Sequence, residues 1–179
     1  MMNELSFTRN IDVSHLGNAG VKQQIVANAE ERLALQNEFG LLGLETLQAD
    51  VDIRPWGPKG VKVDGRLRAD VVQACIVTLE PVPAHIDQRF SLSFLPADAI
   101  AEDPKTVAEA EVVVIYDEED PPEPLEGHAI DLGPIVAEQL ALALDPYPRA
   151  PGASLQEAVE EGAENPASPF AALSKLRDK

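Results

Sequence analysis

The chain has 179 residues and a formal net charge of −17 at pH 7, with a sequence pI near 4.4. Hydrophobic residues make up 45% but aromatic residues only 4%, which fits one compact domain with an aliphatic core and argues against an aromatic platform for nucleic-acid bases. No apolar run fits a signal peptide or a membrane span, and the single cysteine excludes an intramolecular disulfide, so we expect a cytoplasmic protein.

The first predicted elements are a strand, a helix and a second strand. Partial alternation of apolar residues over 5–13 predicts the first strand. Asn28 and Glu31 fit an N-x-x-E capping box, which places the helix at about residues 29–38. Clear alternation over residues 47–54 predicts a half-buried strand that ends at the following proline.

Two further strands follow, joined by a proline-rich segment. Apolar side chains keep one parity from Val61 to Leu79, interrupted at Gly65, where a bulge or a close backbone approach is the usual reason. Residues 80–83 carry two prolines and read as a loop or a sheet edge, and residues 86–94 alternate again. The pattern predicts an α+β fold built on an antiparallel β-meander, either open or curled into a partial barrel.

The C-terminal half adds a strand, an acidic loop and a second helix. The β-branched run at residues 111–116 predicts a strand, and residues 117–127 have the composition of a solvated loop. Asp131 can cap a helix whose apolar spacing lets it pack on the sheet, and Pro146 forbids its continuation.

These elements predict one α+β domain over residues 1–149. Residues 150–179 are small, acidic and proline-bearing, so we expect a largely flexible tail. Its end carries a short amphipathic piece at Phe170, Leu173 and Leu176.

Negative charge is concentrated in one segment, because residues 102–126 contain ten carboxylates and one lysine. A mobile acidic surface attracts basic partners, whereas the simpler reading is a loop that only keeps the protein soluble. The candidate partner-binding residues are Asp117, Glu118, Glu119, Asp120, Glu123 and Glu126.

Positive charge is concentrated between residues 54 and 68, which contain five cations and one aspartate. Side chains two residues apart on a strand project together and could hold phosphates. The alternative, which we favour, is that they pair across the sheet with Asp50, Asp52 and Asp70. The candidates for RNA contact are Arg54, Lys59, Lys62, Arg66 and Arg68.

The sequence contains no familiar catalytic motif, so we predict no enzyme activity, cofactor or metal site. His15, His85 and His128 are widely separated, and scattered surface histidines are commoner than a three-histidine metal site. Cys75 lies on the apolar parity of its strand, which predicts a buried, inert thiol rather than a nucleophile.

Several segments together resemble one known family. They are V-x-G-x-L-x-A-x-V-x-Q-x-C from Val63 to Cys75, TLEPV at residues 78–82, the helix from Asp131, and SPFAALSKL at residues 168–176. With them the chain resembles the YceD family of large ribosomal RNA subunit accumulation proteins, in its alphaproteobacterial branch. Thr78 stands where many YceD-like proteins have a second cysteine, which argues against an inherited zinc or redox role.

The resemblance implies a non-enzymatic role in large ribosomal subunit biogenesis that supports accumulation of 23S ribosomal RNA. The family's gene often lies beside that for ribosomal protein L32, which is small and basic. Since the chain is acidic, we expect its acidic loop and tail to bind a basic ribosomal protein or assembly factor, with only limited 23S RNA contact. The alternatives are a structural homo-oligomeric interaction module and a metal-assisted RNA-processing enzyme.

Overall fold

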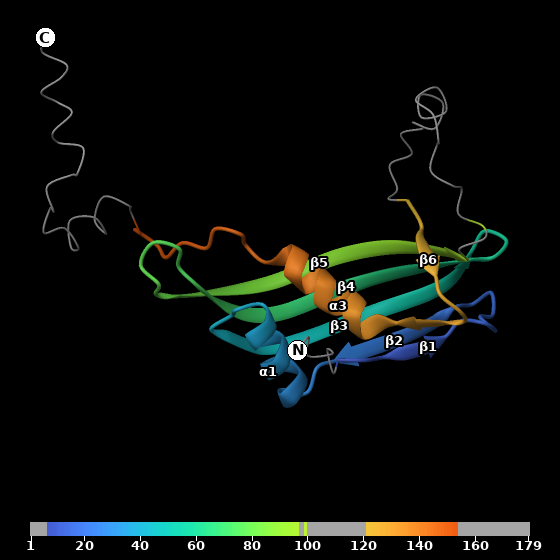
Figure 1. Ribbon diagram of the computed structural model, residues 1–179, viewed down its shortest axis with the longest axis horizontal. Coiled ribbons are helices and arrows are strands. Elements are labelled where there is room, and N and C mark those ends of the chain that lie inside the picture. The colour runs from blue at the N-terminus through green and yellow to red at the C-terminus, as the bar shows by residue number, and fades with distance from the viewer. Residues whose placement is uncertain (1–6, 97–98, 100–120, 154–179) are drawn as a thin grey trace, which may run out of the picture.

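The fold consists of one curved sheet with two helices on the same face (Figure 1). The computed structural model describes residues 7–96, 99 and 121–153. Within these residues the main sheet is open and has the strand order β2-β3-β4-β5-β6, antiparallel except for the last pair, β5 and β6. The α+β meander is therefore confirmed, with the sheet left open. Its strands are β2 (Val21–Val26), β3 (Gly43–Trp56), β4 (Gly60–Ala74), β5 (Pro81–Pro96) and β6 (Glu123–Leu125).

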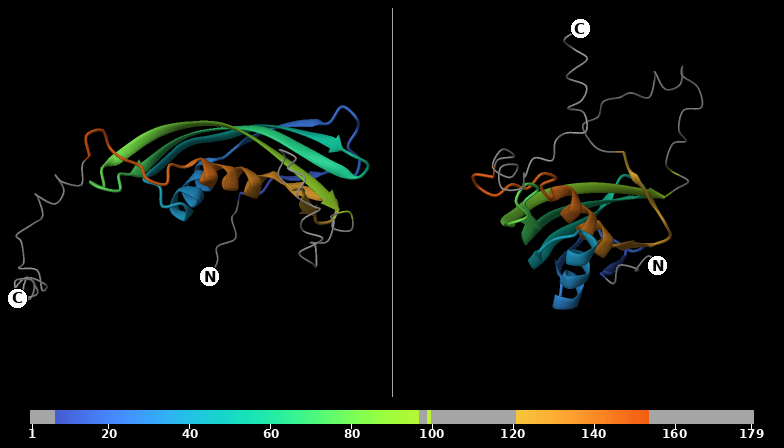
Figure 2. Two further views of the ribbon diagram at one scale, coloured as in Figure 1. Left: turned by 90° about the horizontal axis from the view of Figure 1, so that it is seen from above. Right: turned by 60° about the vertical axis from the view of Figure 1, so that its left-hand side comes forward.

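A second, two-stranded sheet and the two helices cover the inner side. β1 (Asn10–Asp12) pairs antiparallel with β7 (Ala129–Asp131), which leads directly into α3 (Leu132–Ala143). α1 (Ala29–Glu38) packs on β3, and α3 packs on β4 and β5. Figure 2 shows the long strands arching over both helices, so the helices occupy the concave face.

The core follows from alternation along the three longest strands. Odd-numbered apolar residues of β3 and β4, from Leu47 to Ile53 and from Val61 to Val71, are buried against the helices. Leu35 of α1 and Leu140 of α3 are fully buried in the same cluster. Even-numbered residues of β3 and β4 therefore form the opposite, solvent-facing side of the sheet.

Gly65 interrupts the apolar parity because an aromatic ring occupies its place. The pairing register runs through Gly65 without a shift, with Val51 on one side and Phe90 on the other, so no bulge occurs there. A Cβ atom on Gly65 would lie 2.1 Å from the Phe90 ring. The second reading of this glycine, a close approach, is thus confirmed.

This contact gives a stability prediction. We expect Gly65→Ala to lower the free energy of unfolding by about 1–3 kcal/mol, because the new methyl group overlaps the Phe90 ring in a packed core. Gly17→Ala is the matched control, since nothing lies within 4 Å of a Cβ there. Denaturant unfolding measures both, and equal, small effects would contradict this packing role.

Arg9 connects the N-terminal segment to both helices, through an ion pair with α1 and a backbone hydrogen bond to the cap of α3. Both Arg9 guanidinium NH₂ groups donate to the Glu31 carboxylate at 2.8 and 2.9 Å, and this bond lowers the pKa of Glu31. Glu31 also accepts from the Asn28 backbone at 2.8 Å, which confirms the capping box of α1. The Arg9 backbone N–H donates to Asp131, the predicted cap of α3, at 2.6 Å.

Two predicted strands were longer than those observed, and three described strands, β2, β6 and β7, were missed. The prediction of a loop over residues 117–127 was wrong at Glu123–Leu125, which form β6 by pairing with the end of β5. The first strand covers only Asn10–Asp12 within the described residues of 5–13. β2 was not predicted because it is an edge strand in which only Ile25 is buried, which leaves almost no alternation to detect. β4 ends at Ala74 rather than at Leu79, since the chain turns at Cys75 and Leu79 adopts a positive φ of 62°.

The proline-rich segment belongs to a sheet edge, which was one of its two predicted readings. Pro81 and Pro83 lie in β5. β5 pairs with β4 on one side and with β6 on the other. Because β6 pairs only with Phe94–Pro96, the two prolines interrupt no described hydrogen bonds on the β6 side. The predicted strand at residues 111–116, residues 117–120 of the acidic loop and the tail beyond residue 153 lie outside the described residues.

Candidate functional site

The solvent-facing side of β2 to β5, here called the outer face, carries the ladder of cations expected from the sequence. Alternation places the cations and carboxylates of neighbouring strands side by side on it. The cations are Lys22, Arg54, Lys62, Arg66, Arg68 and Arg89, and the carboxylates are Asp50, Asp52, Asp64, Asp70 and Asp87. The remaining predicted cation, Lys59, lies in the turn between β3 and β4. The outer face is thus close to neutral in a chain of charge −17.

Three arginines on this face form ion pairs with diagonal neighbours on the adjacent strand. Arg66 donates to Asp87 through two nitrogens, at 2.6 and 2.5 Å. Arg68 pairs with Asp50, and Arg54 pairs with Asp64. These side chains are about one third to one half exposed, so solvent screens each pair and its contribution to stability is small.

Pairing across the sheet, which we favoured, is confirmed with partly different partners. Asp50 was expected and binds Arg68 of the neighbouring strand. Asp52 was also expected, but it lies 3.7 Å from Arg54 of its own strand, so this contact is not made across the sheet. Asp70 instead accepts from Thr46 at 2.6 Å and lies 2.7 Å from His85.

The pairing also lowers the pKa of two carboxylates, Asp64 and Asp87, that were not among the predicted partners of the cations. The Arg66 hydrogen bonds lower the pKa of Asp87. Burial opposes ionisation of Asp64, but hydrogen bonds from Ser91 and Arg54 outweigh it and lower the pKa of Asp64. Both groups therefore stabilise the fold above their unfolded pKa, and this contribution is lost as the pH falls through the folded pKa.

Two cations of the outer face were missed. Arg89 lies directly opposite Arg66, and Lys22 lies opposite Asp52. Neither forms an ion pair with any residue that the structure describes. The alternation of residues 86–94 already placed Arg89 on the solvent side, whereas Lys22 lies on the strand that was not predicted.

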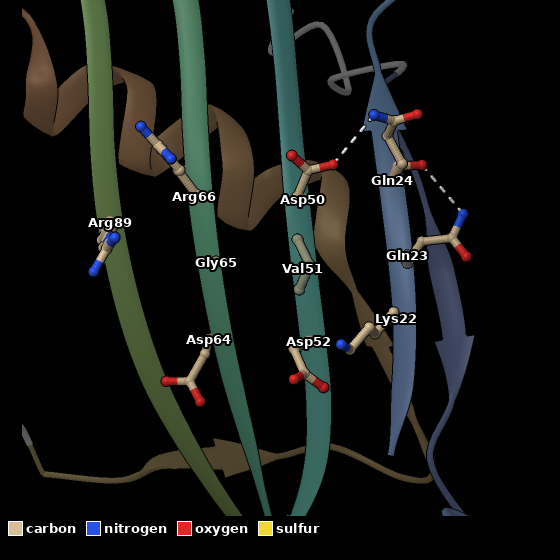
Figure 3. A pocket seen from close by; sticks show the side chains of 10 residues that line it. All are labelled: Lys22, Gln23, Gln24, Asp50, Val51, Asp52, Asp64, Gly65, Arg66 and Arg89. Atoms are coloured by element: carbon tan, nitrogen blue, oxygen red, sulfur yellow. Dashed lines mark hydrogen bonds between the residues drawn. The ribbon is translucent and has the colours of Figure 1, made fainter. Parts of the chain in front are cut away.

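A shallow depression of about 550 Å³ lies across the middle of the outer face. Figure 3 shows Arg66 and Arg89 next to each other on β4 and β5, with Asp64 and Asp52 further along the strands. Its charged and amide lining is completed by Lys22, Gln23, Gln24 and Asp50. Because both signs of charge alternate around it, the depression suits an extended partner of mixed polarity better than an isolated phosphate.

The three histidines are divided between two regions. His85 lies on the outer face beside Asp70 and helps Thr46 to lower the pKa of that carboxylate. Hydrogen bonds from Ser14 lower the pKa of Asp12, with smaller effects from His15 and His128. Among the described residues, no three His, Cys, Asp or Glu side chains come close enough to hold a metal ion.

Of the six candidate partner-binding carboxylates, the structure describes Glu123 and Glu126. Glu123 begins β6, and Glu126 follows it; both are exposed. Partial burial, together with the nearby carboxylate of Glu138 on α3, raises the pKa of Glu123. Asp117, Glu118, Glu119 and Asp120 lie outside the described residues.

Cys75 is buried as predicted, although it lies in a turn rather than in the strand. Its sulfur accepts hydrogen bonds from the Ala150 backbone at 3.3 Å and from Thr78 at 3.4 Å. These bonds lower the pKa of the thiol to about 6. A buried sulfur that accepts two hydrogen bonds is a structural acceptor, and its burial opposes reaction with reagents in solution.

The geometry defines an acidic α+β protein with one open, charge-paired sheet face. Residues 63–177 match the family model described as "Large ribosomal RNA subunit accumulation protein YceD", and the chain belongs to this family. The family name ties it to accumulation of the large-subunit ribosomal RNA. No curated protein and no solved structure matches the chain. None of the helices in the described part is both long and apolar enough to span a membrane.

RNA contact by the outer face stays a prediction that two variants can test. We expect Arg66→Glu with Arg68→Glu to weaken association with a large-subunit ribosomal RNA fragment about tenfold or more, because two cations become anions. Lys22→Glu with Arg89→Glu makes the same charge change without breaking an ion pair among the described residues. Binding and unfolding are measured for both.

If RNA binds through the charges of this face, both double variants associate with RNA more weakly than the original chain does. If the unfolding midpoint falls in the first variant while RNA association is unchanged in both, the ladder is structural.

Proposed function

We propose that this protein is a non-enzymatic, cytoplasmic factor of large ribosomal subunit biogenesis that binds a basic ribosomal protein or assembly factor through its acidic surface. Ribosomal protein L32 is the first candidate partner. The acidic surface comprises Asp117, Glu118, Glu119, Asp120, Glu123 and Glu126. Direct contact with 23S ribosomal RNA is limited to the outer face.

The distribution of charge is the observation that carries this proposal. The outer face carries six cations and five carboxylates, so it contributes almost nothing to the net charge of −17. The excess of carboxylates lies on the rest of the chain, above all between residues 102 and 126. Such a separation steers a basic protein toward the acidic surface and keeps it away from the outer face.

A basic ribosomal protein bound in this way is shielded from non-specific RNA. Its lysines and arginines contact carboxylates, which compete with phosphates for the same side chains. This competition would let a free ribosomal protein reach the growing large subunit without first binding other RNA. The family's connection to ribosomal RNA accumulation supports this role.

Neutralising the loop tests the proposed partner directly. We expect the amide variant of Asp117, Glu118, Glu119 and Asp120 to bind purified ribosomal protein L32 at least about tenfold more weakly and with a smaller dependence on salt. Calorimetry over a salt series measures both. The control removes four exposed carboxylates elsewhere, by changing Glu30, Glu38, Glu45 and Glu80 to Gln.

Equal weakening in the two variants would mean that only net charge matters, and binding that does not depend on salt would overturn the electrostatic basis. Cleavage of precursor RNA by the purified protein with magnesium would assign an enzymatic role instead.

Glu123 allows binding to be separated from stability. Its raised pKa means that the folded state holds its proton more tightly, so its stabilising effect is present at acidic pH and is lost as the pH rises through the folded pKa. We therefore expect Glu123→Gln to gain stability relative to the original chain between pH 4 and pH 7, yet to bind the basic partner more weakly. Unfolding across this pH range and binding at pH 7 check both, and tighter binding would contradict the proposed contact.

A further inference from the structure

The segment that follows α3 is fixed against the turn between β4 and β5. The Ile76 backbone N–H donates to Pro148 at 2.9 Å, and the Ala150 backbone N–H donates to the Cys75 sulfur at 3.3 Å. The Gln73 side chain donates to the Asp145 carbonyl at 2.9 Å. The described chain therefore reaches its last residue at this end of the sheet, far from β6 (Figure 1).

Three large apolar side chains are exposed at this same end. Ile76 is 47% exposed, Leu79 75% and Tyr147 70%. Together they are here called the end patch. They belong to the two segments that the hydrogen bonds above hold together at this end of the sheet.

Leu79 places an exposed apolar side chain at a turn position whose backbone favours glycine. Its φ of 62° lies in the left-handed region. The Leu79 N–H donates to the Cys75 carbonyl at 2.9 Å, and the Cys75 N–H donates to the Glu80 carbonyl at 2.8 Å, so the turn itself accounts for this conformation. The leucine side chain is mostly exposed and is therefore open to a further apolar contact.

The chain itself contains a segment of suitable chemistry. We propose that residues 168–176, SPFAALSKL, dock on the end patch of the same molecule. Phe170, Leu173 and Leu176 recur every three residues, which is the spacing of one helix face, and Ser168 with Pro169 is a common helix start. The family match extends through residue 177 and so includes this segment.

The length of the intervening chain makes the contact within one molecule favourable. Sixteen residues separate Ala153 from Phe170, and a flexible chain of that length has a root-mean-square span of about 20–24 Å. Its effective concentration at the end patch is in the millimolar range, so even a weak contact is populated. Lys175, Arg177 and Lys179 also give the segment a positive end, which complements the exposed carboxylates of Glu80 and Asp145.

Hydrogen exchange of the full-length chain tests this docking. We expect Phe170→Ser with Leu173→Ser to raise amide exchange at least about threefold in residues 75–80 and 145–153, because the cover is lost. Leu155→Ser with Val159→Ser is the matched control, since it removes two apolar residues from the intervening chain. Equal exchange in all three proteins would overturn the proposal. Protection that grows with protein concentration would overturn it as well, because a second copy would then be the cover.

Leu79→Gly supplies a second, independent variant. Glycine suits the positive φ, so the chain keeps or gains stability, while residues 145–153 exchange as fast as in the Phe170→Ser, Leu173→Ser protein. Unchanged exchange in residues 145–153 would contradict the docking contact. This contact does not depend on the ribosomal partner, so its failure would leave the proposed function standing.

Discussion

Two-residue alternation along β3, β4 and β5 is the constraint on which the rest of the structure depends. These antiparallel strands are 14 to 16 residues long, and a slip of one residue in their register would turn charged side chains toward the helices. The contact between Phe90 and Gly65 acts against such a slip, because the ring fits only opposite a residue without a Cβ atom. The same alternation places five cations and five carboxylates of these strands on the outer face, and β2 adds Lys22.

Because these charges pair with one another, the outer face and the acidic surface differ in what they can bind. The arginines expected to contact RNA already have carboxylate partners, so phosphate binding must compete with Asp50, Asp64 and Asp87. Glu123 and Glu126 form no ion pair with any described residue, and the Glu138 carboxylate adds to the negative charge near Glu123. For a family tied to ribosomal RNA accumulation, this difference is the reason that we propose binding of a ribosomal protein over direct binding of RNA.

Much of this fold could be predicted where local signals were strong. The capping box gave α1 its observed bounds, the Asp131 cap gave the start of α3, and alternation gave most of β3 to β5. Prediction failed where tertiary contacts decide. β2 buries only Ile25, and the end of β4 depends on hydrogen bonds from the distant segment around Ala150. For the candidate site, the alternation predicted the cations of β4, but their diagonal partners depend on the register, which no local pattern specifies.

The most direct measurement is affinity purification of the tagged protein from growing cells at low and high salt, with bound proteins identified by mass spectrometry and bound RNA by sequencing. The amide variant of Asp117, Glu118, Glu119 and Asp120 is purified in parallel. We expect a basic large-subunit protein to accompany the original chain at low salt, to be lost at high salt and to be depleted from the variant. Recovery of 23S precursor RNA without such a protein, equally from both chains, would contradict the proposal and point to the outer face.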